Sequence, residues 1–242
     1  MVKNNYEILT ITQPRSAYGE SFRRLQVNLQ YASVDKPYRV IQVISSKPGE
    51  GKTTATLNLA AVYAEKKRKV IVLDLDLRNP KLHRAFKLHV NDRPGITQFI
   101  LGKAKIEDVI YNGENGIDII TRGEKIAFPE TLLESKALGE LISKLKEIYE
   151  YIIIDCPPSL VVTDSMIISK YVDCQLLIAK YKQTKKAELA ETIRMFRKIK
   201  GNIAGIVLNG SKNQSGAYHG RYYGYYSNYY SSKYEYGQGG DK

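Results

Sequence analysis

The chain has little of what disulfide-bonded, metal-binding or membrane-spanning proteins need. Its 242 residues include two cysteines, three histidines and no tryptophan. Cys156 and Cys174 follow no pairing or metal-binding spacing, which predicts a reduced, cytosolic protein. The longest apolar runs, such as Tyr151–Ile154 and Leu176–Ala179, are far shorter than the roughly 20 residues that span a bilayer. The polar start, Met1 to Glu7, lacks the apolar core of a signal peptide.

Charge is dominated by one sign. There are 37 Lys and Arg residues against 25 Asp and Glu, a formal net charge of +12. Such an excess fits nucleic acid or an acidic membrane surface, but it also fits a solvated basic surface. The run Lys66–Lys69 ends a predicted helix, where cations complement the helix dipole. We favour the solvated surface and expect no nucleic-acid partner, while acidic lipid or an acidic protein stays open.

Short runs rich in Ile and Val alternate with amphipathic stretches. Strands are predicted at Arg39–Ser45, Lys69–Leu73, Gly116–Thr121, Tyr151–Asp155, Asp173–Ala179 and Ile203–Leu208. Helices are predicted at Ala17–Ala32, Lys52–Glu65, Thr131–Glu150, Asp164–Lys170 and Lys185–Ile199. This order predicts an α/β fold, a mainly parallel sheet with helices on both faces. Ligands of such sheets bind at the carboxyl ends of the strands.

Composition changes sharply near Ser211. From there the chain is mostly Gly, Ser, Asn and Tyr, with almost no aliphatic residue to build a core, and we predict a flexible tail. About half of the 19 tyrosines of the chain fall in it: Tyr218, Tyr222, Tyr223, Tyr225, Tyr226, Tyr229, Tyr230, Tyr234 and Tyr236.

The strongest motif is the run Ser46–Thr53, which follows a predicted strand and opens a predicted helix, as a P-loop does. Backbone N–H groups of such a loop hold phosphate oxygens. Lys52 would reach the β- and γ-phosphates, and the Thr53 hydroxyl would bind magnesium, which predicts ATP and Mg²⁺ as ligands. Ser46 replaces the usual first glycine, and the alternative is an ordinary glycine-rich turn. The predicted nucleotide-binding residues are Pro48, Gly49, Glu50, Gly51, Lys52, Thr53 and Thr54.

Acidic residues follow two of the predicted strands. Asp155 ends an Ile-rich strand, where a carboxylate can hold magnesium through a water or cap a helix. Cys156 stands next, in place of the glutamate that activates water in many P-loop ATPases, which argues against a motor or pump. Asp74 and Asp76 repel each other unless they share a cation or one is protonated. Near a P-loop that cation is magnesium, and the alternative is a polar strand end.

Together these motifs resemble the bacterial tyrosine kinases of capsule and exopolysaccharide synthesis. That family carries a P-loop, an Asp-x-Asp-x-Arg motif, an Asp-x-Pro-Pro strand end and a terminal tyrosine cluster. The chain has all four in that order, with Asp74–Arg78 and Asp155–Pro158 as the second and third, and Pro129–Ser135 resembles the segment before the family's long helix.

The resemblance implies a protein-tyrosine kinase that phosphorylates its own tail tyrosines. Lys52 and Thr53 then bind ATP and magnesium, and the aspartates order the metal. Asp74 or Asp76 takes the proton of the incoming tyrosine. A free tyrosine has a pKa of about 10, so a positioned base contributes typically 10²–10⁴-fold. Asn209, at the end of the last strand, would contact the adenine, although a turn-forming asparagine is an equal alternative.

The family also has a Glu-x-x-Arg-x-x-Arg helix used in ring assembly. Glu20 and Arg23 fit it, but Gln26 stands at the third position, so a ring would have fewer charge contacts. The alternative is a surface helix pair. The predicted domains are an N-terminal helical segment for oligomerisation, residues 1–38, the P-loop kinase domain, residues 39–211, and the tyrosine-rich tail, residues 212–242.

Partners are implied by the same resemblance. Family members without their own membrane span rely on a separate transmembrane activator of the polysaccharide co-polymerase type. The expected protein is therefore cytoplasmic and recruited to the inner face of the membrane. Neighbouring subunits and a protein-tyrosine phosphatase complete the expected set.

Two other functions compete. A partition or division-site ATPase that binds DNA or membrane would carry a signature lysine, and Lys47 occupies that position. Pro48, Arg78 and the tyrosine tail argue against it. The tail could instead be a stacking segment on a nucleotide switch, since tyrosines stack on bases. Its net charge near +1, from Arg221, Lys233 and Lys242 against Glu235 and Asp241, suits phosphate backbones poorly.

Overall fold

The computed structural model describes residues 8–33, 36–88 and 93–211. The chain divides into a unit Met1–Asn209 and a segment Gly210–Lys242, and only the first is described here. The nine tail tyrosines lie outside the described residues.

A seven-stranded sheet forms the centre of this unit, in the order β3-β4-β2-β5-β1-β6-β7. All neighbours are parallel except β3, which is antiparallel to β4. The central strands are apolar throughout because both faces are covered. The strands are β1 Val40–Ser45, β2 Val70–Asp74, β3 Tyr111–Asn112, β4 Ile117–Ile120, β5 Tyr151–Asp155, β6 Cys174–Lys180 and β7 Ile203–Asn209.

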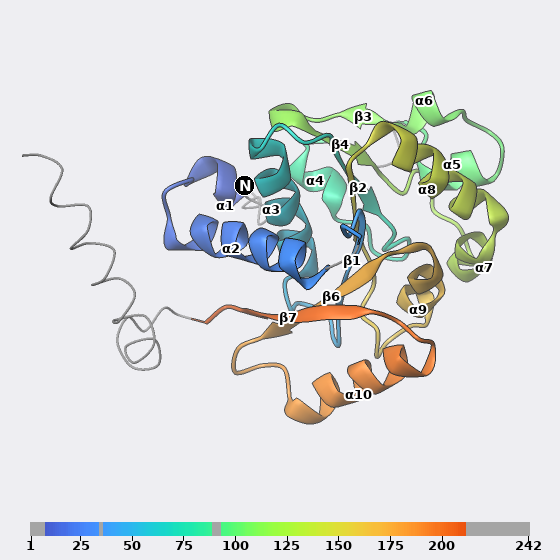
Figure 1. Ribbon diagram of the computed structural model, residues 1–242. Coiled ribbons are helices and arrows are strands. Elements are labelled where there is room, and N and C mark those ends of the chain that lie inside the picture. Colours follow the sequence, from blue (N-terminus) through green and yellow to red (C-terminus); the bar gives the residue numbers. More distant parts are fainter. Residues whose placement is uncertain (1–7, 34–35, 89–92, 212–242) are drawn as a thin grey trace, which may run out of the picture. The chain divides into compact units, whose positions relative to one another are not determined.

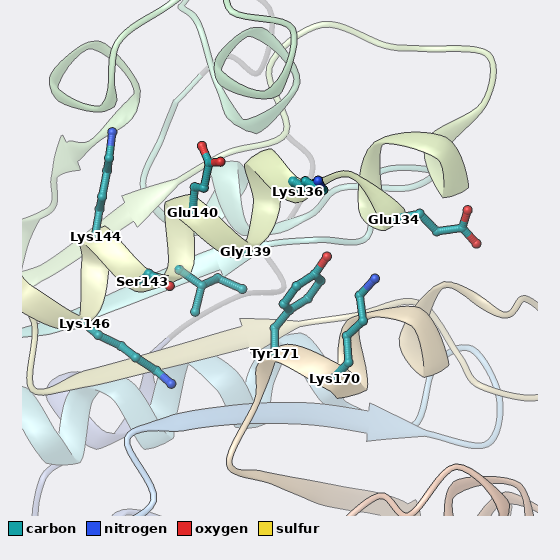
Figure 2. Close-up of a pocket in the computed structure, with 10 residues that line it drawn as sticks. Glu134, Lys136, Gly139, Glu140, Ser143, Lys144, Lys146, Lys170 and Tyr171 are labelled. Atoms are coloured by element: carbon teal, nitrogen blue, oxygen red, sulfur yellow. The ribbon is translucent and has the colours of Figure 1, made fainter.

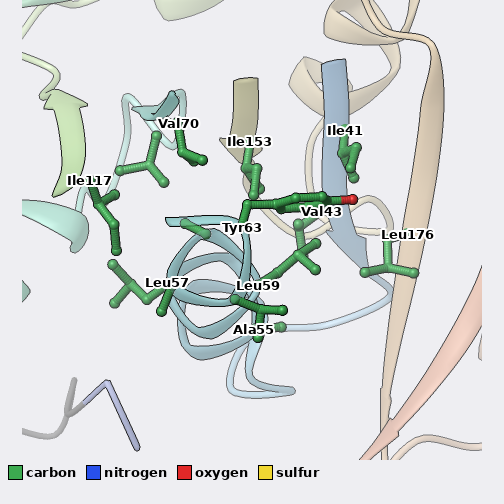
Figure 3. Close-up of a cluster of buried hydrophobic side chains, with 14 of the residues drawn as sticks. Ile41, Val43, Ala55, Leu57, Leu59, Tyr63, Val70, Ile117, Ile153 and Leu176 are labelled. Atoms are coloured by element: carbon green, nitrogen blue, oxygen red, sulfur yellow. The ribbon is translucent and has the colours of Figure 1, made fainter. Parts of the chain in front are cut away.

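Helices cover both faces of the sheet (Figure 1). On one face α3 (Lys52–Glu65) lies between the sheet and α2 (Ala17–Ala32), so it is buried on nearly all sides, with small alanines that allow close approach. Figure 3 shows its Leu57, Leu59 and Tyr63 against the strands. The other helices of this face are α1 Leu9–Thr12 and α4 Leu82–Ala85.

The opposite face has two helix groups. The first packs against β2, β4 and β5, and its largest member, α8 (Lys136–Ile148), contributes a leucine stripe. The second is α10 (Lys186–Lys198), whose Phe196 packs against Ile44 and Leu177. The remaining short elements of the whole unit, on either face, are α5 Ile96–Ile100, α6 Ile106–Val109, α7 Pro129–Glu134, α9 Asp164–Ile168, and the 3-10 turns η1 Glu114–Gly116 and η2 Ser169–Tyr171.

The predicted fold class is confirmed, and two helix predictions need correction. The stretch Thr131–Glu150 is two helices, because Ser135 is extended, with φ −65° and ψ 149°, between α7 and α8. The helix predicted at Asp164–Lys170 ends at Ile168 and continues as a 3-10 turn. Among the described residues, β3 and the short helices α1, α4, α5 and α6 went unpredicted, since each is too short to show a hydrophobic period.

Candidate nucleotide and phosphotransfer site

The P-loop connects β1 to α3 and needs two left-handed glycines. Gly49 has φ +79° and Gly51 has φ +101°. A Cβ on Gly51 would lie 2.0 Å from Nδ2 of Asn209, which donates a 2.9 Å hydrogen bond to the carbonyl of Glu50. The last strand of the sheet therefore holds the loop in shape. The predicted contact of Asn209 with adenine stays a prediction.

Side chains from the end of β6, from the start of α10 and from the connection between them hold the same loop. The buried Glu50 carboxylate accepts from the amide of Lys47 at 2.9 Å and from the hydroxyl of Thr184. Lys180 Nζ donates to the carbonyl of Gly49 at 3.2 Å, and Lys47 Nζ pairs with Glu188 at 2.7 Å. These contacts fix the loop in the shape that an anion cradle requires.

The P-loop lysine is a buried cation with a neutral partner. Lys52 is 8% exposed, and its Nζ donates to Oγ of Ser45 at 3.0 Å. Burial lowers the pKa of this ammonium, while the charges of Asp155 and Asp76 oppose the shift. A buried charge without a close counterion is unfavourable, and a bound phosphate would remove that penalty.

Two carboxylates meet at the ends of neighbouring parallel strands. Asp74 on β2 lies opposite Asp155 on β5 in the sheet register. Asp155 Oδ2 accepts from the Thr53 hydroxyl at 2.6 Å, and Asp74 Oδ2 accepts from the amides of Lys81 and Leu82 at 2.9 Å each. Among the described residues, the Oδ1 atom of each aspartate is buried with no partner.

Burial is the main cause of the raised pKa values of these acids. It raises the pKa of Asp155 to about 6 and that of Asp74 well above its ordinary value, and the charge of Asp155 adds to the shift of Asp74. Asp76 follows the strand, accepts from the amide of Asn79 at 3.0 Å, and also has a raised pKa because of burial. Its 8% exposure makes it the most accessible of the three.

These groups fit a magnesium ion that is shared with a phosphate. Within residues 8–33, 36–88 and 93–211, no three His, Cys, Asp or Glu side chains lie close enough to hold a metal alone. Mg²⁺ in nucleotide sites is usually held by one or two carboxylates together with phosphate oxygens and waters. The two partnerless oxygens of Asp74 and Asp155, beside the Thr53 hydroxyl, supply that donor set.

Arg78 was identified in a sequence motif, but the sequence did not reveal its partners. Its Nε donates to Asp164 at 2.9 Å, and its Nη2 donates to Glu130 at 2.7 Å. Asp164 is completely buried. The arginine thus joins the loop after β2 to α9 and α7. Glu130 and Asp164 lie 52 and 86 positions after Arg78, so no local spacing in the sequence links them to it.

The predicted interface residues already have partners within the chain. Arg23 bonds Glu65 of α3 through Nε at 3.0 Å and Nη2 at 2.9 Å, and lies 3.5 Å from Glu20. Gln26 is buried and accepts from Lys66. These contacts attach α2 to α3, and a role in oligomerisation stays a prediction.

A surface hollow of about 800 Å³ lies away from the phosphate site, between α8 and η2 (Figure 2). Its floor includes Gly139, Ile142 and the ring of Tyr171, and lysines stand around it. None of the P-loop residues or paired aspartates lines it. The chemistry is therefore assigned to the strand ends rather than to this hollow.

A phosphate cradle of this construction, at the carboxyl edge of a parallel sheet, defines the P-loop nucleotide-binding proteins. A family model described as an AAA domain matches residues 38–204. Tyrosine-protein kinase YwqD of Bacillus subtilis is 33% identical over 206 residues, which are 85% of this chain and 86% of that protein. The chain therefore belongs to the bacterial tyrosine kinase family, as its motifs indicated.

Some relatives are longer than this chain. Tyrosine-protein kinase etk of Escherichia coli K12 is 30% identical over 216 residues, which are 88% of this chain but 30% of that protein. The solved kinase domain of Escherichia coli ETK matches with a TM-score of 0.82 at 29% identity, over 90% of this chain and 86% of that domain.

The similarity of this chain to division-site ATPases is weaker than its similarity to the tyrosine kinases. MinD of Pyrococcus horikoshii, solved with Mg-ADP, matches with a TM-score of 0.61 at 27% identity over 72% of each chain. Nucleotide and Mg²⁺ binding is supported in general by this fold neighbour. The kinase interpretation is favoured over the partition or division-site alternative, since kinases match over more of the chain and more closely.

No helix among the described residues combines the length and apolar character needed to cross a bilayer.

Proposed function

We propose that this chain uses ATP and Mg²⁺ to phosphorylate the tyrosines of its own C-terminal tail, and that it regulates capsular or exopolysaccharide synthesis. The observation that carries the proposal is the buried pair Asp74 and Asp155, whose partnerless oxygens lie beside the P-loop threonine. Bound magnesium would neutralise charge on the phosphates. The acceptors are the tyrosines between Tyr218 and Tyr236.

Each residue of the site then has a defined role. Lys52 leaves its Ser45 partner for the β- and γ-phosphates, and Thr53, Asp74 and Asp155 hold the metal. Asp76 takes the proton from the incoming tyrosine, since it is the most accessible of the three acids. Burial raises the pKa of Asp76, and a carboxylate with a raised pKa is a stronger base.

Phosphate mapping tests this function. Pure protein is incubated with ATP and Mg²⁺, and modified residues are identified by mass spectrometry. We expect phosphotyrosine concentrated between Tyr218 and Tyr236. Phosphate mainly on serine or threonine, or steady ATP hydrolysis without phosphotyrosine, would contradict the kinase assignment.

We also propose partners. A transmembrane activator of the polysaccharide co-polymerase type would hold the kinase at the inner face of the membrane, and a phosphatase would reset the tail. Support comes from the lengths of the relatives. The chain matches 86% of YwqD but 30% of etk. In our proposal a separate protein supplies the membrane attachment. Neighbouring subunits are the expected partners for phosphate transfer between chains.

A further inference from the structure

The loop after β2 folds back so that its last residue touches the first catalytic carboxylate. The amide of Lys81 donates to Oδ2 of Asp74, seven positions earlier, at 2.9 Å. The turn is fixed by Asn79, whose amide bonds Asp76, and by Pro80, which is buried and has a restricted φ. Arg78 anchors the same loop to α7 and α9. The backbone of Lys81 is therefore held firmly at the edge of the site.

The side chain of Lys81 carries a second positive charge that acts on the groups of the site. It is half-buried, and its charge acts on Lys52, Asp76 and Asp155. Unlike Arg78, it forms no ion pair with any carboxylate in the described ranges. A rigid loop thus uses one cation as an anchor and leaves the other available to a ligand.

The sheet order places the backbone of Lys81 and the ammonium of Lys52 on opposite sides of the strand that carries Asp155. Ser45, which now holds Lys52, ends β1, while Lys81 is bonded to the end of β2, and β5 with Asp155 lies between these strands. Adjacent strands are about 4.8 Å apart, so β1 and β2 are about 10 Å apart. That span accommodates a phosphate group with one lysine on each side.

We propose that Lys81 is a second catalytic lysine, whose ammonium binds the γ-phosphate of ATP from the side opposite Lys52. This role rests on the proposed function. During transfer the bond from phosphorus to the bridging oxygen of ADP breaks, and its electron pair stays with ADP. A bond from the tyrosine oxygen to phosphorus forms, the tyrosine proton goes to Asp76, and Lys81 stays protonated. Its charge stabilises the oxygens of the moving phosphoryl group.

Lys81→Met removes the ammonium but keeps the backbone amide that bonds Asp74. We expect turnover to fall about 10²–10³-fold, as for loss of one charged donor at a transition state. Binding of a non-hydrolysable ATP analogue, relative to ADP, should weaken about tenfold or more. Lys81→Arg should retain part of both. Lys103→Met, an exposed lysine beyond α5, is the matched control, and Lys81→Gln serves if the methionine variant does not fold.

Three outcomes would overturn the role. One is an unchanged preference for the analogue over ADP with turnover within about twofold of the parent. Another is an unchanged preference with an upward shift of the acidic limb of the pH–rate profile, which would mean that Lys81 acts on Asp76 or Asp155 instead of on phosphate. The third is an equal loss in Lys103→Met. A parent without phosphotyrosine would refute the kinase function alone, since the nucleotide preference still tests Lys81.

Discussion

Replacing a buried catalytic acid should make the nucleotide-free protein more stable. Asp155 is 2% exposed, and burial raises the pKa of its carboxyl from 3.8 to about 6. A difference of about two pKa units corresponds to about 3 kcal/mol. Because the folded-state pKa is the higher one, this cost is fully present above about pH 6 and disappears as the pH falls toward 3.8.

Asp155→Asn removes the charge and keeps an oxygen that can accept from Thr53. The buried amide retains part of the desolvation cost. We therefore expect a net gain of about 1–2 kcal/mol at pH 8, or about 2–8 °C in Tm for a domain of this size. Kinase activity should be lost, because the variant cannot hold the metal as a carboxylate does.

Urea unfolding in EDTA at pH 8 and pH 5 measures the effect, with Glu147→Gln, an exposed carboxyl on α8, as control. The advantage of Asp155→Asn should shrink at pH 5, where the parent carboxyl is mostly protonated. Mg²⁺ and ADP should stabilise the parent more than the variant. A variant that is no more stable than the parent at pH 8, or an advantage that persists unchanged at pH 5, would refute the reasoning.

Further predictions concern the loop, the transfer and the tail. Lys52→Met should abolish tail phosphorylation in a protein that still unfolds cooperatively, and retained activity would remove Lys52 from the mechanism. Gly51→Ala should lower nucleotide affinity, because its Cβ would lie 2.0 Å from Asn209 Nδ2 at φ +101°; full affinity by fluorescence titration would contradict this. A Lys52→Met chain mixed with an active tail-less chain should become phosphorylated by mass spectrometry, and an unmodified tail would argue against transfer between molecules. Five phosphotyrosines would add roughly −8 to −10 charges to the tail, and the acidic site of a neighbouring subunit would repel it. Light scattering should therefore give a lower mass for phosphorylated than for dephosphorylated samples, and an equal mass would exclude control of assembly by phosphorylation.

The sequence predicted the core of the site because its signals are local. The loop and α3 follow from a glycine-lysine-threonine run between an apolar strand and a helix, and Lys52–Glu65 was predicted with the bounds that the structure has. Asp74 and Asp155 could be placed together because parallel strands end at the same edge. Their direct pairing in the sheet register comes from the structure and was not predicted.

What the sequence did not show depends on contacts between distant segments. Thr184 donates a hydrogen bond to Glu50, 134 positions away, and no sequence spacing predicts this contact. Arg78 was noticed as a motif residue, but its buried partner Asp164 belongs to another helix. The break at Ser135 left only a weak signal, a residue type that favours helix starts. Lys81 belongs to no sequence motif, and its position beside Asp74 follows from the fold of the loop after β2.

The bond between Arg23 and Glu65 bears on the predicted assembly through α2. An arginine whose Nε and Nη2 both donate to a carboxylate of its own chain would exchange that carboxylate for another when it binds a neighbour. The net energy of such an exchange is a difference between two similar surface pairs, each worth about 0–1 kcal/mol. Contacts of this kind can set the orientation of subunits without holding them together. Such a weak interface would suit the phosphate transfer between chains that we propose, because the subunits would separate easily after the reaction.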